Sequence, residues 1–390
     1  MRPLRLGIDI HSVGSQKGGN ATYYRELVKE LFNVRCDHNF LLYYTNPAAP
    51  EQFNAGQRFV FRRLIPASRW LRIPFTLPSL AWHDKLDLFH AQFIVPPFLK
   101  CKTVTTIPDI AYEHSPDFFP FHQRAWLKVL VRESARRADH IITVSERSKS
   151  DLIQLYGVSP EKITVTYEGA GDEFVPLDKS QARERVERKY GIHGEFILYL
   201  GRLQGRKNLI RLVHAFATVR KAGFAHKLVL AGKTDSLFQP TLSLIRELKL
   251  ENDILLPGYV DAQDLPSLYN AAEIFVYPSL YEGFGLPVVE AMACGTPVIT
   301  SRGSSLEEVA GAAALLVDAL DQRSLAEALT RLLADPGLRE QLGKAGVSRS
   351  SQFSFKRAAH QTIGVYERVL GGDNARESAE SLPLQGRECL

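Results

Sequence analysis

The chain has few cysteines, no long apolar run and no acidic Asp-x-Asp triplet. Its four cysteines are scattered without a Cys-x-x-Cys pair or a Cys/His cluster, which argues against a zinc site and a disulfide framework and predicts reduced, structural thiols. No apolar run approaches the roughly 18 residues needed to span a bilayer, and the N-terminus lacks the apolar core of a signal peptide. We therefore expect a cytoplasmic protein.

Length and composition predict two globular domains. A chain of 390 residues is too long for one typical domain, and its hydrophobic content of 45% can fill two cores. The charge is unevenly placed, because residues 1–170 carry 22 Lys and Arg against 16 Asp and Glu, whereas the rest carries 26 against 27. A nucleic-acid binder would use such a basic surplus, but no recognition motif accompanies it, so no nucleic-acid partner is expected.

Short β-branched and aromatic runs alternate with helical patterns along most of the chain. In the first half the runs lie at 4–10, 40–44, 59–64, 86–90, 103–107, 140–144 and 163–167, and the helical patterns at 22–31, 124–138 and 149–156. In the second half the runs lie at 196–200, 227–231, 253–256, 274–277, 297–300 and 314–317, and the helical patterns at 209–221, 239–250 and 322–334. This alternation predicts an α/β protein with parallel, doubly wound sheets.

Breaker-rich residues 168–176 separate the two series and predict an interdomain hinge. We expect an N-terminal Rossmann-like domain at 1–170 and a C-terminal one at 171–355. In open α/β sheets, ligands bind beyond the carboxyl ends of the strands, so the site should lie in a central cleft between the domains.

Two glutamates eight residues apart carry the most informative pattern. Gly283, Gly285 and Pro287 lie between Glu282 and Glu290 and make one helix through the interval improbable. Glu282 is therefore expected in a loop, and Pro287 at the first position of a helix that carries Glu290. The alternative is an ordinary strand–turn–helix connection with two solvated acids.

Such a helix start would leave the amides of Phe284 to Val288 free to point into the space that Glu282 overlooks. Free amides at a helix N-terminus attract phosphate. The segment thus offers amides to an anion and carboxylates to neighbouring hydroxyls, as a sugar nucleotide requires.

A second pattern, at residues 199–208, places two cations between a strand and a helix. Arg202 follows Gly201 at the strand end, and Lys207 comes five residues later. The planar guanidinium of Arg202 can grip a phosphate, and Lys207 adds a point charge. The alternative is that both side chains are simply solvated at a helix end.

The segment 281–293 resembles the E-x7-E signature of retaining glycosyltransferases with the two-domain GT-B fold. This family contains many bacterial mannosyltransferases and sucrose-phosphate synthases. Residues 201–208 are similar to its diphosphate motif, and the likeness extends from Gly18 to Gly311. The resemblance implies a GT-B fold in which a last helix, at 356–370, returns to the first domain. The composition of 371–390 predicts a mobile tail.

The resemblance also implies a mechanism without a protein nucleophile. The donor diphosphate departs from the face on which the acceptor hydroxyl attacks, and its oxygen takes the hydroxyl proton. Arg202 and Lys207 would stabilise the leaving diphosphate, while Glu290 would bind the ribose and Glu282 the donor sugar. The expected catalytic residues are Glu282, Arg202, Lys207 and Asp109, and the expected donor-binding residues are Gly18, Gly19, Gly201, Val260, Gly283, Phe284, Gly285, Leu286 and Glu290.

Three segments of the first half and one of the second complete the resemblance. A glycine pair, Gly18-Gly19, follows the first strand where the family approaches the donor phosphate. Pro108 precedes Asp109 where many relatives have histidine, so the first domain lacks that imidazole as a contact for the donor sugar. His90, at a strand end, is more often a hydrogen-bonded core residue than a catalyst. Val260 falls where the family places backbone contacts to the nucleobase.

No bridging metal is expected, because the chain lacks an acidic triplet, and the resemblance implies no other cofactor. The expected donor is a nucleotide-diphosphate sugar, with GDP-mannose first and a UDP-hexose second, and the acceptor a glycan or lipid-linked sugar of surface polysaccharide assembly. The stretch from Arg58 to Phe75 mixes arginines with bulky aromatics, which suits peripheral contact with the inner membrane face or, equally, a solvated sheet edge.

Three rival functions would also use α/β domains or a bound nucleotide. A nicotinamide dehydrogenase is disfavoured, because the glycine pattern at 283–288 lacks its third glycine and lies late in the chain. A non-hydrolysing sugar-nucleotide epimerase shares the fold and stays open. A catalytically silent sugar-nucleotide-binding protein also stays open, because Pro108 replaces the family histidine.

Overall fold

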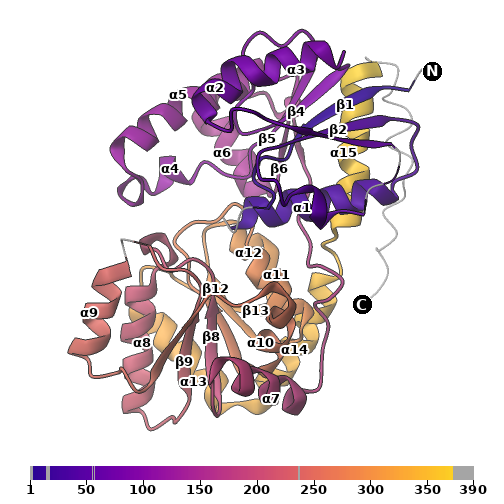
Figure 1. Cartoon of the computed structure of the whole chain (residues 1–390). Coiled ribbons are helices and arrows are strands. Elements are labelled where there is room, and N and C mark those ends of the chain that lie inside the picture. The colour runs from indigo at the N-terminus through magenta and orange to yellow at the C-terminus, as the bar shows by residue number, and fades with distance from the viewer. Residues whose placement is uncertain (1–2, 15–17, 55, 57, 236–237, 372–390) are drawn as a thin grey trace.

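The computed structural model describes residues 3–14, 18–54, 56, 58–235 and 238–371. Within them, the chain forms two α/β units, drawn one above the other in Figure 1. All strand pairs in the first sheet are parallel, in the order β3-β2-β1-β4-β5-β6-β7. Its strands are β1 (Arg5–Asp9), β2 (Asn39–Tyr44), β3 (Phe59–Arg63), β4 (Leu88–Gln92), β5 (Lys102–Thr106), β6 (His140–Thr143) and β7 (Ile163–Val165).

The helices around the first sheet bury apolar stripes against it. In α1, for example, Tyr23, Leu27 and Leu31 recur at helical spacing and are fully buried. The helices are α1 (Gly19–Asn33), α2 (Arg69–Leu71), α3 (Leu77–His83), α4 (Ala111–His114), α5 (Phe121–Arg137) and α6 (Glu146–Tyr156), with a π-helical turn, η2 (Arg72–Thr76), between α2 and α3.

The second sheet is also parallel and has the order β10-β9-β8-β11-β12-β13. Its strands are β8 (Phe196–Leu200), β9 (Lys227–Ala231), β10 (Ile254–Gly258), β11 (Ile274–Tyr277), β12 (Val298–Ser301) and β13 (Ala314–Val317). Its helices are α7 (Lys179–Tyr190), α8 (Leu209–Lys221), α9 (Gln239–Glu247), α10 (Leu265–Ala271), α11 (Leu286–Ala293), α12 (Ser305–Ala310), α13 (Gln322–Ala334) and α14 (Pro336–Ser350).

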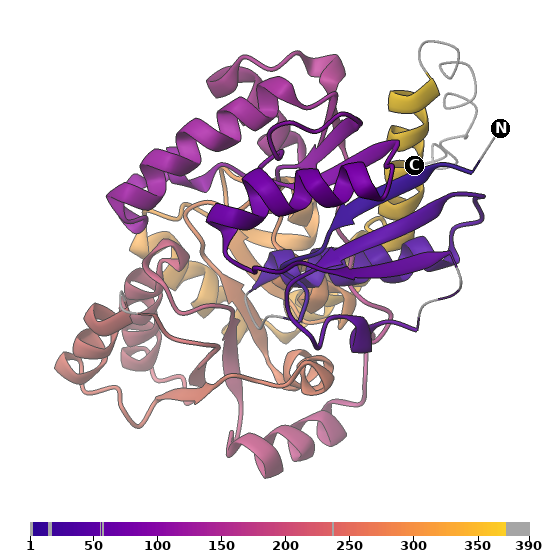
Figure 2. The same cartoon turned by 45° about the horizontal axis from the view of Figure 1, so that its top comes forward.

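The last helix, α15 (Phe355–Gly371), lies beside the strands of the first sheet, where both views show it in yellow (Figure 1, Figure 2). Tyr366 of α15 is fully buried and its hydroxyl lies 2.6 Å from His90 Nδ1. The other ring nitrogen of His90 lies 2.6 Å from Thr106 Oγ1, and burial lowers the pKa of the imidazole to about 3. His90 is therefore a hydrogen-bonded core residue.

The structure corrects some of the expected helix limits. The helix expected at 239–250 ends at Glu247, because Lys249 adopts a left-handed conformation with φ of 55°. The helix expected at 149–156 begins at Glu146, because the Ser145 hydroxyl caps it by accepting a bond from the amide of Ser148. Such limits depend on local caps that periodicity does not reveal.

The sequence predicted no membrane-spanning segment and reduced cysteine thiols. Across the described parts of the chain, every helix is too short or too polar to cross a bilayer. The described cysteines, Cys36, Cys101 and Cys294, are all free thiols. Cys389 and the tail from 372 onward lie outside the described residues.

Candidate active site

The ends of three neighbouring strands form a glycine-lined edge on the second sheet. Gly201, Gly232 and Gly258 follow or end β8, β9 and β10, and all three have positive φ. A Cβ at Gly232 would lie only 1.8 Å from the Gly201 carbonyl oxygen, so Gly232 cannot be replaced by a larger residue without backbone movement. Val260, just beyond, is 4% exposed.

Glu282 lies in the loop between β11 and α11, as expected, and is buried among cations. Its Oε1 accepts hydrogen bonds from Lys207 Nζ and Ser279 Oγ, and its Oε2 lies 3.2 Å from a terminal nitrogen of Arg206. Lys207 also donates to the Tyr277 hydroxyl at 2.6 Å. Because a carboxylate has about four acceptor positions, three are taken and about one stays open to a ligand hydroxyl.

The cluster contains one carboxylate and two cations, and burial and the neighbouring charges shift their pKa values. Burial works against ionisation of Glu282, but the charges of Arg206 and Lys207 outweigh it and lower its pKa to about 2. Burial lowers the pKa of Lys207 to about 8 despite the neighbouring carboxylate. Arg206 keeps its charge under all ordinary conditions. The cluster therefore carries one net positive charge at neutral pH, which suits a diphosphate.

Glu290 lies on α11, where its carboxylate is 8% exposed and accepts a hydrogen bond from the Tyr269 hydroxyl at 2.7 Å. Burial raises its pKa to about 7, although the bond from Tyr269 opposes this. Gly285, with φ of 112°, precedes the helix, which begins at Leu286. Pro287 is thus the second helical residue rather than the first.

The free amides at the start of α11 are fewer than expected. The amide of Val288 donates to the Gly285 carbonyl at 2.9 Å and is therefore already used. Phe284 is buried, and its carbonyl accepts from the Ser305 hydroxyl at 3.1 Å. The prediction of free amides was wrong for Val288, because the first turn closes tightly behind the glycine.

Residues of the first unit reach this loop directly. A Cβ at Gly283 would lie 2.7 Å from the Pro108 carbonyl oxygen and 2.9 Å from the Asp109 Cβ, so glycine permits the close approach. Asp109 Oδ1 accepts a bond from the amide of Ala111 at the start of α4. Gly18, which has φ of 74°, lies near the Arg202 side chain, because a Cβ there would be 3.9 Å from Arg202 Cδ.

Arg202 and Lys207 do not come together as one pair. Lys207 is buried beside Glu282, whereas Arg202 is exposed and lies toward the glycine pair Gly18-Gly19 of the first unit. The second cation at Glu282 is Arg206, which the sequence pattern did not single out. Arg206 directly precedes Lys207 in a short 3-10 turn, and nothing in the sequence pattern signalled that it faces Glu282.

Glu168 is a further acid that sequence reasoning missed. It lies in the segment that leaves the first sheet and is 7% exposed. Burial, together with the charges of Asp109, Glu290 and Glu282, raises its pKa to about 8. Glu168 therefore keeps its proton at neutral pH.

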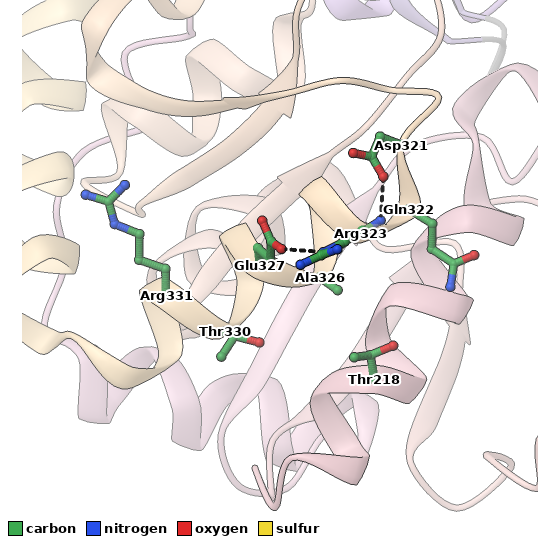
Figure 3. A pocket seen from close by; sticks show the side chains of 8 residues that line it. All are labelled: Thr218, Asp321, Gln322, Arg323, Ala326, Glu327, Thr330 and Arg331. Carbon is green, nitrogen blue, oxygen red and sulfur yellow. Dashed lines mark hydrogen bonds and ion pairs between the residues drawn. The ribbon is translucent and has the colours of Figure 1, made fainter.

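A hollow of about 700 Å³ lies elsewhere, between α8 and α13 (Figure 3). Its lining includes Thr218, Gln322 and Arg331, and none of the expected site residues contributes to it. Arg323 and Glu327, also in its wall, pair with each other along one helix. The hollow therefore has no share in the site.

Two parallel α/β units, with buried acids and cations in the loops where they meet, have the arrangement of a glycosyltransferase of the GT-B type. Residues 17–173 match the model of Glycosyltransferase Family 4, and residues 182–349 match that of Glycosyl transferases group 1. The O-antigen chain mannosyltransferase B of Escherichia coli is 31% identical over 371 residues, which cover 90% of this chain and 96% of the relative. The chain belongs to the family 4, group 1 glycosyltransferases.

Other matches agree with this assignment. The MMP alpha-(1->4)-mannosyltransferase of Mycolicibacterium hassiacum is 33% identical over 261 residues, or 63% of this chain and 61% of the relative. Among solved structures, sucrose-phosphate synthase from Thermosynechococcus elongatus has a TM-score of 0.78 at 23% identity and covers 94% of this chain and 99% of that one. The structural likeness supports the GT-B fold. The chain thus transfers a glycosyl group from a nucleotide sugar.

Proposed function

We propose that the protein transfers a mannosyl group from GDP-mannose, with retention of the anomeric configuration, to a sugar acceptor of surface polysaccharide assembly. The main support for this choice of donor and acceptor is the likeness to the O-antigen chain mannosyltransferase along nearly the full length of both chains. The retaining course is supported by Glu282 and Glu290, which keep the E-x7-E spacing and lie on the loop and the helix that the signature requires.

The buried cluster supports a division of roles. Lys207 and Arg206 would stabilise the charge that grows on the departing diphosphate, and Arg202 would contact it from the exposed side. Glu282, held by three partners, would offer its remaining acceptor position to a donor hydroxyl. Glu290 would bind the ribose. Asp109, next to Gly283, would contact the donor sugar from the first unit.

The backbone would complete the donor site. Gly18 and Gly19 would let the first unit approach the donor phosphate closely, and Gly201 would do the same at the end of β8. The amides of the turn at Gly283, Phe284, Gly285 and Leu286 would help to hold sugar and phosphate, and Val260 would contact the nucleobase. Because the cluster already supplies fixed cations, we propose transfer without a bridging metal.

The experiment is a thermal-shift screen followed by analysis of the product. GDP-mannose should raise the melting temperature more than GDP-glucose, UDP-glucose or ADP-glucose, because a ligand that binds only the folded state stabilises it. NMR of the new glycosidic bond should show the anomeric configuration of the donor. Preference for a UDP-hexose would replace the donor assignment, and an inverted product would refute the retaining course.

We also propose a lipid-linked acceptor, reached by peripheral docking at the inner membrane face through α2, the turn η2 and the start of α5. Large apolar side chains are exposed there, including Trp70 at 61%, Phe75 at 64% and Phe121 at 76%. The Arg69 guanidinium lies 4.9 Å from the ring centre of Trp70 and 4.4 Å from that of Trp126, which joins α2 to α5. Exposed aromatics with cations suit an anionic lipid surface.

The structure decides which arginines test this docking. Arg58 is directed inward onto backbone carbonyls, Arg72 is 5% exposed, and Arg62 pairs with buried Asp84 at 3.3 Å. Arg63 and Arg69 are exposed and suited to replacement. Each basic residue near an anionic surface contributes about 1 kcal/mol, so R63E/R69E should weaken binding to anionic vesicles by about thirtyfold or more.

The matched control is a double charge reversal on the second unit, R323E/K344E, at side chains that are 86% and 77% exposed. It should leave vesicle binding within about twofold of wild type, since the surface potential falls off within a Debye length. Co-sedimentation at low and physiological salt is the assay. Wild-type protein that stays in the supernatant with both anionic and neutral vesicles would favour a soluble acceptor.

A further inference from the structure

Tyr281, directly before Glu282, is held by the first unit although it belongs to the second. Its side chain is 3% exposed, and its hydroxyl donates to Asp151 Oδ2 at 2.6 Å. Its ring stacks on that of His114, with centroids 4.5 Å apart and planes 16° from parallel. His114 Nε2 lies 3.1 Å from the same Asp151 oxygen. We call these three residues the tyrosine clasp.

The loop around Glu282 is thus fixed from both units. From the second unit, Arg206 donates to the Tyr281 carbonyl oxygen, and the amide of Leu280 donates to the Arg206 carbonyl at 3.0 Å. From the first unit, Ser148 Oγ lies 3.4 Å from the Gly283 carbonyl oxygen. Only the contacts from the first unit can be lost when the two units separate.

We propose that Tyr281 is a positioning residue, which through Asp151 and His114 makes the placement of Glu282 depend on closure of the two units. The proposal rests on the role proposed above for Glu282. A hydroxyl bonded to a charged acceptor in a buried site is among the stronger hydrogen bonds in proteins. When the units part, Tyr281 loses this bond and its stacking partner, and the donor-binding loop loses its support on that side.

The test compares two tyrosine-to-phenylalanine variants. Tyr281→Phe removes the hydroxyl of the clasp and keeps the ring. Tyr167→Phe is the control, because its hydroxyl donates to Glu308 Oε1 at 2.8 Å, another tyrosine–carboxylate bond between the units that does not adjoin Glu282. Y281F should lower kcat about tenfold and change KM for the donor less than threefold, whereas Y167F should keep kcat within threefold.

Substitutions at Asp151 separate hydrogen bonding from packing. Asp151→Asn keeps an oxygen that can accept from Tyr281, so it should retain several-fold more activity than Asp151→Ala. In a double-variant cycle, Y281F should add little to D151A, because both remove the same bond. Fully independent effects would overturn the clasp.

A donor-free measurement separates this proposal from the proposed function. Hydrogen exchange of the amides from Ser279 to Leu286 should be about tenfold faster in Y281F than in wild type and unchanged in Y167F. Unchanged exchange in Y281F, or equal loss of kcat in both variants, would refute the positioning role. Failure of wild-type protein to transfer any sugar would refute the proposed function and leave the exchange result standing.

Discussion

Removing the negative charge of Glu282 should destabilise the fold more than removing the positive charge of Lys207. Glu282→Gln leaves Arg206 and Lys207, with side chains 14% and 8% exposed, facing each other without an anion. Leaving a buried charge unpaired costs roughly 3–5 kcal/mol. Lys207→Met instead leaves Glu282 paired with Arg206 and Ser279. It removes the bond between opposite charges, worth about 1.5–3 kcal/mol, and the bond to the neutral Tyr277 hydroxyl, but it leaves no buried charge unpaired. E282Q should therefore be the less stable variant.

The two variants should also differ in their response to pH. Burial holds the pKa of Lys207 at about 8, below its ordinary value of 10.5, and without Glu282 it should fall further. A base whose pKa is lower in the folded state favours folding when it is deprotonated. The penalty of E282Q should thus shrink as pH rises from 7 to 10, whereas the penalty of K207M should not.

Circular dichroism melts measure the effect, and tryptophan fluorescence provides an internal control. All three tryptophans, Trp70, Trp82 and Trp126, lie in the first unit, so their transition should shift less than the dichroism. K207M should in addition lower kcat about a hundredfold, since a donor to the developing charge is lost. A K207M protein at least as unstable as E282Q, or one with full turnover, would refute this account of the cluster.

Three further predictions concern the carboxyl groups and the cations. Glu290→Gln should weaken donor binding and change the turnover of the bound complex little. Wild-type donor affinity should rise about tenfold between pH 6 and 8, because Glu290, with a pKa of about 7, must be ionised to accept from both ribose hydroxyls. Calorimetric titration of both proteins across that range checks this, and a flat profile for wild type would contradict it. Glu168→Gln should stabilise the fold by roughly 3–5 kcal/mol above pH 8 and hardly at all below pH 4.5. The reason is that an acid whose pKa is raised to about 8 in the folded state makes the folded protein less stable as pH rises. Melting temperatures at pH 4.5 and 9 test this, and equal shifts at both would be evidence against a buried, protonated Glu168. Activity should persist in excess EDTA, because Arg206 and Lys207 supply fixed charge at Glu282; complete loss that magnesium or manganese restores would count against the site.

Periodicity and breakers were sufficient to predict the α/β class and most strands, because parallel strands are short continuous apolar runs between helical patterns. Four strands of the second sheet lie at the expected limits, including β8 and β11. The GT-B arrangement and the family were inferred from the E-x7-E resemblance, and the comparisons confirm the fold and the family.

The partners of the site residues could not be predicted in the same way. Tyr269 and Arg206 reach the two glutamates from other elements, and Ser279 reaches Glu282 from three residues earlier in the same loop. Neither spacing nor motif encodes those contacts. The short turn at Gly205–Lys207 buries Lys207 and turns Arg206 toward Glu282, while Arg202 stays exposed. Which of three nearby cations faces an acid is decided by tertiary packing.

The return of α15 to the first sheet has a consequence for synthesis. The bond between Tyr366 and His90 joins residues 276 positions apart, so the first unit remains incomplete on the ribosome until almost the whole chain has emerged. The second unit can assemble earlier from consecutive segments. A nascent chain that stops before Phe355 would expose to water the residues of the first sheet that α15 covers. Such a chain would depend on chaperones to avoid aggregation. In this protein the part made first is therefore expected to finish folding last.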